Sequence, residues 1–220
     1  MTTLASADAN LNRKNPVALN APGMNFEMVC ADPDPLGVFG FAFATFLANL
    51  SALGFFAFNA MWLSTMIFLG GVVELIAGWQ DFRRNNLFGA TVFGFFGAGW
   101  TGNAIVAWMV ERQLLPPTDP FSLGWYLLFW AVFVGAMTGM SLKLNKCMTA
   151  ILVLVTLLEL FGAIGSFTGL VWITKVGNAC GCLSALIGLY VGTAGLWNAA
   201  FGRTVLPLGA WAPRAPAPAR

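Results

Sequence analysis

Histidine is absent from this chain of 220 residues, and charged residues make up only 9% of it. Without histidine the chain cannot build a Ser-His-Asp triad or most catalytic zinc sites. No glycine-rich segment ends in Gly-Lys-Ser or Gly-Lys-Thr, which excludes a phosphate-binding loop for ATP. The four cysteines match no zinc spacing. We therefore predict a protein that is not an enzyme and holds neither a metal nor a cofactor.

Basic residues are scarce as well. The formal net charge is +2, and Lys and Arg are scattered through the predicted loops rather than gathered in a stripe, which excludes a nucleic-acid partner. Hydrophobic residues make up 58% of the chain, in runs long enough for helices that cross about 30 Å of hydrocarbon. The 25 glycines and 20 phenylalanines suit close helix packing in lipid. These features predict an all-α membrane protein surrounded by the lipid bilayer.

Three regions follow one another along the chain. Residues 1–31 form a polar tail without a secretory signal, residues 32–209 a transmembrane domain, and residues 210–220 a Pro/Ala-rich tail. The domain contains six apolar stretches: 36–57, 61–79, 88–110, 121–141, 147–173 and 177–199. Short links join them, the last one at Thr174-Lys175-Val176.

Lys and Arg divide unevenly between the two sides of the six predicted spans. Two of them, Arg112 and Lys175, lie on one side. The other nine lie opposite: Arg13, Lys14, Arg83, Arg84, Lys143, Lys146, Arg203, Arg214 and Arg220. By the positive-inside rule both termini are expected in the cytoplasm. We expect a multi-pass protein of the plasma membrane, with an organelle membrane as the alternative.

Two acidic residues, Glu74 and Glu159, fall inside predicted spans. A charged carboxylate at mid-bilayer costs at least about 2.5 kcal/mol, so such residues usually face a bundle interior or an aqueous path. A carboxyl removed from water tends to keep its proton. We therefore regard both glutamates as candidate proton carriers. The alternative is a neutral glutamic acid that forms a hydrogen bond to a neighbouring helix.

Other residues align at helical spacing on three predicted spans. The aligned sets are Phe41, Thr45 and Asn49; Phe96, Trp100 and Asn103; and Val155, Glu159, Gly162 and Ser166. The polar members that we predict to line a pathway are Thr45, Asn49, Trp100, Asn103 and Ser166. Small residues form further stripes, expected at helix contacts: Gly40, Ala44 and Ala48; Gly94, Gly97, Gly99 and Gly102; Ser184, Gly188 and Gly192.

A short motif before the first span points to a known family. The segment Asp32-Pro33-Asp34-Pro35-Leu36-Gly37 resembles the Asn-Pro-Ala-Pro-Leu-Gly signature of the acetate uptake transporter family, also called GPR/FUN34/YaaH. Further segments resemble that family in the same order: 70–78, 86–91, 126–133 and 201–209. The resemblance covers residues 32–209 with hardly a gap.

The resemblance implies six helices around a pore in each protomer, a homo-hexamer, and passage of acetate and similar short monocarboxylates with protons. The family's constriction of Phe, Tyr and Leu falls here on Phe41, Phe96 and Val155. The change of Tyr to Phe removes a hydroxyl, and that of Leu to Val removes a methylene. We therefore expect a more apolar and slightly wider constriction, which we call the neck.

Four acids also depart from the family pattern. Asp32 and Asp34 replace Asn and Ala, Glu74 stands where Gln is usual, and Glu159 replaces an apolar residue. Acids beside an anion path repel the substrate unless they are protonated, paired or turned away. Two alternatives to monocarboxylate transport therefore stay open. One is passage of ammonia, ammonium or another small solute, and the other is a non-conducting structural subunit of a membrane complex.

Overall fold

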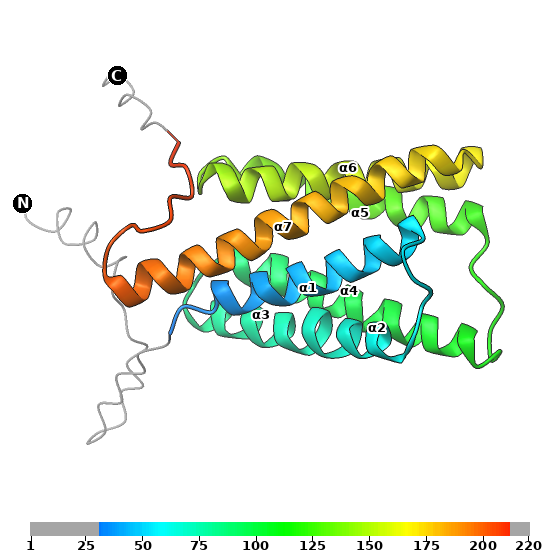
Figure 1. Ribbon diagram of the computed structural model, residues 1–220, viewed down its shortest axis with the longest axis horizontal. Coiled ribbons are helices and arrows are strands. Elements are labelled where there is room, and N and C mark those ends of the chain that lie inside the picture. The colour runs from blue at the N-terminus through cyan, green and yellow to red at the C-terminus, as the bar shows by residue number, and fades with distance from the viewer. Residues whose placement is uncertain (1–30, 212–220) are drawn as a thin grey trace, which may run out of the picture. The chain divides into compact units, whose positions relative to one another are not determined.

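A computed structural model describes residues 31–211 (Figure 1). In the compact unit that begins at Pro33, the regular secondary structure of the described part is helical, apart from one isolated bridge between Asn145 and Ala210. Its elements are α1 (Asp34–Leu53), α2 (Ala60–Thr65), the π-helix η2 (Met66–Val73), α3 (Glu74–Arg83), α4 (Leu87–Glu111), α5 (Pro120–Ser141), α6 (Lys146–Thr168) and α7 (Val171–Phe201). Most of the two predicted tails, residues 1–30 and 212–220, lies outside the described residues.

Within the described range, five helices are long and apolar enough to cross a membrane, and α2, η2 and α3 count as one of them, Ala60–Arg83. α4 has 25 residues, but its Gly, Thr, Asn and Trp residues make it less apolar. Large apolar side chains on the outer surfaces are exposed, among them Trp79 at 67% and Phe129 at 72%. Such surfaces need lipid or a protein neighbour, so the chain is an integral membrane protein.

The predicted link between the last two spans is wrong. Residues 174–176 are helical and belong to α7, and the chain turns at Gly169 and Leu170 instead. Gly169 has φ 72°, a left-handed conformation that favours glycine, and its N–H donates to the Gly165 carbonyl and ends α6. The polar pair at Thr174 and Lys175 mimics a loop in the sequence. In the structure it lies in the second turn of a helix.

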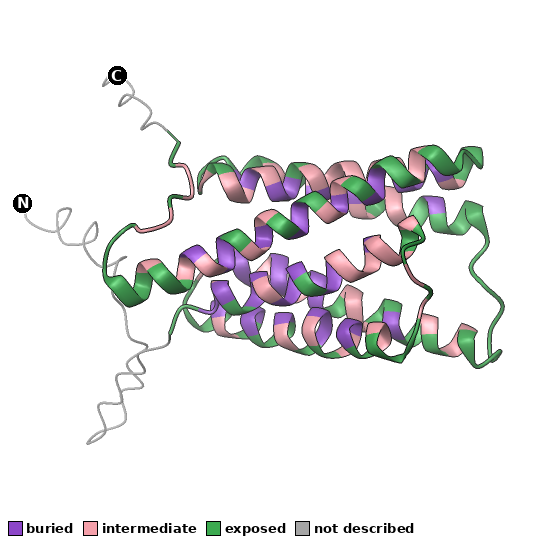
Figure 2. Cartoon of the chain, viewed as in Figure 1, coloured by how far each residue is buried: buried purple, intermediate pink, exposed green. Residues whose placement is uncertain are grey.

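Neighbouring helices pack in a simple order. α4 packs against α3, α3 and η2 against α1, α1 against α7, α7 against α6, and α6 against α5. The two ends of this series, α4 and α5, have little close backbone contact and meet through aromatic rings. Phe95 stacks on Phe133 with ring centroids 4.6 Å apart, and the ring centroids of Phe96 and Trp130 are 5.3 Å apart. Figure 2 shows buried and exposed residues alternating along the helices, which gives each an inward face.

The small-residue stripes on α1 and α7 lie at helix contacts, as predicted. A Cβ added at Gly188 would come within 3.2 Å of Ala42 Cβ, and one at Gly40 within 2.5 Å of the Leu69 carbonyl oxygen. The stripe on α4 is only partly at contacts. Gly97 abuts Leu75, whereas Gly94 and Gly102 have no described atom within 4 Å of an added Cβ. Gly94 nevertheless lies at a helix contact, because a Cβ added at Gly78 of α3 would stand 2.7 Å from the Gly94 backbone nitrogen. The prediction is wrong at Gly102, where no close contact with a neighbouring helix is described.

Candidate functional site

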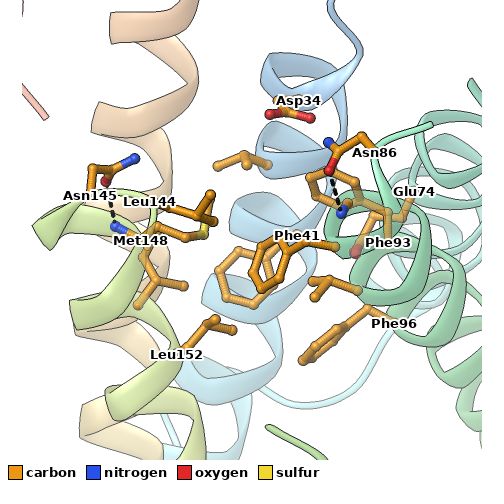
Figure 3. Close-up of a pocket in the computed structure, with 15 residues that line it drawn as sticks. Asp34, Phe41, Glu74, Asn86, Phe93, Phe96, Leu144, Asn145, Met148 and Leu152 are labelled. Atoms are coloured by element: carbon orange, nitrogen blue, oxygen red, sulfur yellow. Dashed lines mark hydrogen bonds between the residues drawn. The ribbon is translucent and has the colours of Figure 1, made fainter. Parts of the chain in front are cut away.

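A cavity of about 120 Å³ lies among α1, α3, α4 and α6 (Figure 3). Its walls are mostly apolar: Val38, Phe41, Phe88, Val92, Phe93, Phe96, Leu144, Met148, Ile151 and Leu152. Its polar lining residues are Asp34, Glu74, Asn86 and Asn145. In Figure 3, Asp34, Asn86 and Asn145 lie at one end, here called the polar end. Phe41, Phe96 and Leu152 lie toward the opposite, apolar end.

The polar end is built from the beginnings of three helices. Asp34 belongs to the first turn of α1. Asn86 caps α4, where its Oδ1 accepts from the Gly89 N–H at 3.2 Å, and Asn145 caps α6, where its Oδ1 accepts from the Met148 N–H at 2.8 Å. Helix N-termini carry partial positive charge, each worth about 0.3–1 kcal/mol to a nearby anion. The three helix N-termini therefore favour a negatively charged group at the polar end, whereas a charged Asp34 carboxyl would oppose it, and the described lining contains no Lys or Arg.

The C-terminal segment completes the start of α6. The Gly209 carbonyl accepts from the Lys146 N–H at 2.8 Å, and the Leu208 carbonyl accepts from the Cys147 N–H at 3.2 Å. Asn198 of α7 holds the same segment through bonds to the backbone of Val205 and Leu206. The first-turn N–H groups of α6 therefore have partners already. Any attraction to an anion here acts through the field of the helix.

The three predicted neck residues lie in one buried cluster. The rings of Phe41 and Phe96 meet edge to face, with centroids 5.9 Å apart. Both line the cavity, whereas Val155, at 1% exposure, is buried in the same cluster without lining it. Trp130 of α5 packs against Phe96 from the other side. The cavity wall at Phe41 and Phe96 thus carries no hydroxyl or other polar group.

Glu74 is the most unusual residue of the cavity. It is 1% exposed, and neither carboxyl oxygen has a hydrogen-bond partner among the described residues. It follows directly on the π-helix η2, an insertion type that often marks functional sites. Gly40 of α1 leaves the space that its side chain occupies, since an added Cβ would stand 3.3 Å from Glu74 Cγ. Glu74 is thus a buried carboxyl that faces a cavity.

The remaining predicted residues do not line this cavity. Asn49 donates to the Thr45 carbonyl of its own helix at 2.7 Å, and its amide fills the space beside Gly181 of α7, so Asn49 lies at a helix contact. Asn103 accepts from the Tyr126 hydroxyl at 2.8 Å. Trp100 packs on Gly70, and its buried Nε1–H has no described partner.

Two further predicted residues, Glu159 and Ser166, are half-buried on α6. Both lie beyond Val155 along the helix, away from the polar end, which is next to the start of α6. The structure therefore separates the two candidate proton carriers. Glu74 lines the cavity, and Glu159 does not.

The signature motif acts mainly through packing. Pro35 fits against Gly195 of α7, where an added Cβ would stand 2.7 Å from Pro35 Cγ. Gly37 lies under the Phe93 ring, 2.6 Å from an added Cβ. Pro33 is buried, and Asp32 and Leu36 are exposed. Within the motif, only Asp34 lines the cavity.

Sequence reasoning missed Asn86 and Asn145 as site residues. Both precede an apolar run directly, which is the signal of a helix cap. That signal predicts a helix start, but it does not tell which starts share a cavity. The π-helix that positions Glu74 was also missed, because its apolar sequence differs little from that of an ordinary span.

The described fold and cavity define a polytopic helical membrane protein with an internal, largely apolar site for a small solute. Residues 19–209 match the model of the GPR1/FUN34/yaaH family, and the chain belongs to this family. It is 32% identical over 179 residues to the "Succinate-acetate/proton symporter SatP" of Escherichia coli strain K12, covering 81% of this chain and 95% of that protein.

Two other comparisons bear on the site. The solved "Structure of the bacterial acetate channel SatP" superimposes with a TM-score of 0.79 at 32% identity, over 82% of this chain and 99% of that chain. "Ammonia transport outward protein 2" of Saccharomyces cerevisiae is 32% identical over 190 residues, which cover 83% of this chain and 66% of that protein. The chain is therefore similar both to proteins named for acetate and to one named for ammonia.

Proposed function

We propose that the protein moves acetate and similar short monocarboxylates across a membrane together with protons. The observation that carries this proposal is the cavity, with its polar end at three helix N-termini and its apolar end at Phe41 and Phe96. About 10–15 Å³ is enough for one water molecule, so about 120 Å³ admits a solute of several heavy atoms. The names of SatP as an acetate channel and a succinate-acetate/proton symporter support the same substrate class.

The proposed pathway runs from the polar end of the cavity through the neck of Phe41, Phe96 and Val155. Beyond the neck it follows the predicted lining residues: Thr45, Asn49, Trp100, Asn103 and Ser166. The unpartnered Nε1–H of Trp100 supports this course, because it offers a donor one turn beyond Phe96. Asn49 is the exception among these residues, because its hydrogen bond to the Thr45 carbonyl and its contact with Gly181 favour a packing role.

The topology belongs to the same proposal. We infer six membrane crossings, with α4 included because it packs on α3 and lines the cavity. The described residues Arg83, Arg84, Lys143, Lys146 and Arg203 lie at the polar end's side of the helices, which supports cytoplasmic termini in the plasma membrane. The exposed apolar face of α5 supports assembly into a homo-hexamer or contact with lipid.

Ammonium passage is the second candidate. Asp34 and Glu74 are the titratable residues that line the cavity, and this lining contains no Lys or Arg. Two carboxyl groups would attract a cation if both were charged. The similarity to a yeast protein named for ammonia transport supports this second candidate.

Purified protein in liposomes tests these candidates. We expect labelled acetate to accumulate along an imposed pH gradient faster than in protein-free liposomes, which correct for unassisted permeation of acetic acid. The variant Val155→Phe narrows the proposed neck and should slow acetate at least several-fold. Ammonium flux without acetate flux would establish the second candidate. Absence of both would favour the non-conducting structural subunit.

A further inference from the structure

We propose that Glu74 exchanges a proton with the substrate's carboxyl group inside the cavity, so that the substrate crosses the Phe41–Phe96 contact as the neutral acid. This inference rests on the proposed function. It begins from the isolation of the Glu74 carboxyl, whose two oxygens are buried and have no partner in the described part of the chain. Of the other three polar residues of the lining, Asn86 and Asn145 have protein partners, and Asp34 also has an interaction in the described structure.

The described residues around Glu74 offer no compensating charge. Along α1 the titratable residue is Asp34, in η2 there is none, and along α4 it is Glu111, at the far end of that helix. α6 faces the cavity with Met148, Ile151 and Leu152. On α3 itself, Asp81 has its own partners in Arg84 and Asn86. An unpaired buried carboxylate costs several kcal/mol, so in the empty cavity Glu74 holds its proton and offers an O–H donor without an acceptor.

A carboxylate is the ligand that fits such a donor. It accepts a charge-assisted hydrogen bond, which is about twice as strong as a neutral one. The proton then moves: the O–H bond of Glu74 breaks, an O–H bond forms on the substrate, and the negative charge passes to Glu74. A proton from water at the polar end restores the Glu74 acid. In the opposite direction of flux the same steps run backwards.

The apolar neck is the reason why the substrate crosses more easily after it has taken up a proton. Phe41 and Phe96 present apolar ring surfaces, and an ionised carboxylate loses its hydration there at a penalty far above that of a neutral acid. Each substrate therefore crosses with one proton. The chemical class that follows is weak monocarboxylic acids. Anions of strong acids, such as nitrate, cannot take up the proton and should be excluded.

The test compares Glu74→Gln with Glu159→Gln, a matched control in which the other membrane glutamate, outside the cavity lining, is changed. Glutamine keeps a hydrogen-bond donor but has no proton to give. In liposomes, acetate flux through the wild type should fall only gently as pH rises above the pKa of acetic acid. Flux through Glu74→Gln should fall about tenfold per pH unit, in proportion to the neutral acid already in solution. The half-saturating acetate concentration should change less than the maximal rate.

Two further measurements keep the inference falsifiable. Infrared difference spectra should show a protonated carboxyl band that changes when acetate is added, in the wild type and Glu159→Gln but not in Glu74→Gln. Glu74→Asp, which keeps a carboxyl, should recover part of the flux at neutral pH. A folded Glu74→Gln protein with the wild-type pH profile would overturn the role of Glu74 and leave the proposed function standing. A wild type without acetate flux would overturn both.

Discussion

Glu74 and Asp81 lie seven residues apart on α3, and both are almost completely buried, at 1% and 0% exposure. Their surroundings differ. Asp81 Oδ1 accepts from Asn86 Nδ2 at 3.1 Å and lies 3.7 Å from Arg84 Nη1, within the turn that joins α3 to α4. Glu74 has no such bond in the described structure and faces a cavity. The same chemical group thus serves two purposes, depending on whether the protein supplies its partner.

The two regions are nevertheless connected. Asn86 donates to Asp81, caps α4 and lines the cavity. The Asp81 carboxyl therefore fixes the loop that shapes the polar end, whereas the Glu74 carboxyl has no described partner and is free to take the proposed role toward a ligand. Burial alone does not separate a structural acid from a functional one. The two kinds of acid differ in whether the protein supplies a hydrogen-bonding or charged partner. Each prediction below changes one side of this comparison.

The largest effect is expected at Gly89, which lies directly against the Asp81 carboxyl. An added Cβ would collide with Asp81 Oδ2 and stand 2.7 Å from Asn86 Nδ2. Gly89→Val should therefore lower the free energy of unfolding by about 3 kcal/mol or more, because both overpacking and loss of the pair act together. Thermal unfolding in detergent measures the change.

Gly94→Ala is the matched control on the same helix. A Cβ at Gly94 has no described atom within 4 Å, and alanine favours a helix over glycine by about 1 kcal/mol. This variant should be as stable as the wild type or more so. Equal stability of Gly89→Val and Gly94→Ala would show that the turn around Asp81 does not hold the carboxyl as described.

A moderate effect is expected when each acid becomes its amide. Asp81→Asn weakens the bonds to Arg84 and Asn86 and should lower the free energy of unfolding by about 1–3 kcal/mol. The Arg84 pair adds only a part of this, since its side chain is 32% exposed. Glu74→Gln should leave the stability within about 1 kcal/mol of the wild type. The double variant should show the sum, because the two sites share no partner.

A larger loss for Glu74→Gln than for Asp81→Asn would reverse the comparison. It would mean that Glu74 holds the helices together. The measurement is equilibrium unfolding in mixed micelles, with acetate flux as the second readout. Flux should follow the opposite order, with Glu74→Gln impaired more than Asp81→Asn at neutral pH.

The sequence predicts the helices better than it predicts the cavity. Long apolar runs place the helices within a few residues, and the small-residue spacing at Gly188 and Gly192 predicts a helix contact, because both features are local. The turn at Gly169 was missed, since Thr174 and Lys175 resemble a loop more than Gly169 and Leu170 do. A glycine ends a helix by its conformation, which hydropathy does not register.

The site was predictable only in part. Glu74 stands out as an acid in an apolar run, and the resemblance supplied Phe41 and Phe96, which both line the cavity. Asn86 and Asn145 meet there only because α4 and α6 begin at the same end of the fold. Asn49 looked like a pathway residue by spacing, but its bond to Thr45 and its contact with Gly181 depend on the neighbour α7. Such contacts between distant segments are not visible in spacing along one helix.

The smallest effect concerns an exposed acid, Asp119, which caps α5. Its Oδ1 accepts from the Ser122 N–H at 3.0 Å. Hydrogen bonds from the side chain and the backbone of Ser122 lower the pKa of Asp119 below its ordinary value of 3.8. A carboxyl whose pKa is lower in the folded state stabilises the fold above its unfolded pKa. This contribution disappears as pH falls through the folded pKa.

Asp119→Asn isolates this contribution, because asparagine also caps helices but does not titrate in this range. The difference in melting temperature between the wild type and Asp119→Asn should be constant from pH 7 to pH 5. Below about pH 3.8 the melting temperature of the wild type should fall relative to that of Asp119→Asn, as the cap carboxylate takes up its proton. The shift should be smaller than that of Asp81→Asn, since water competes for an exposed carboxylate and does not reach a buried one. A difference that stays constant down to pH 3 would show that the charge of Asp119 adds nothing to the cap.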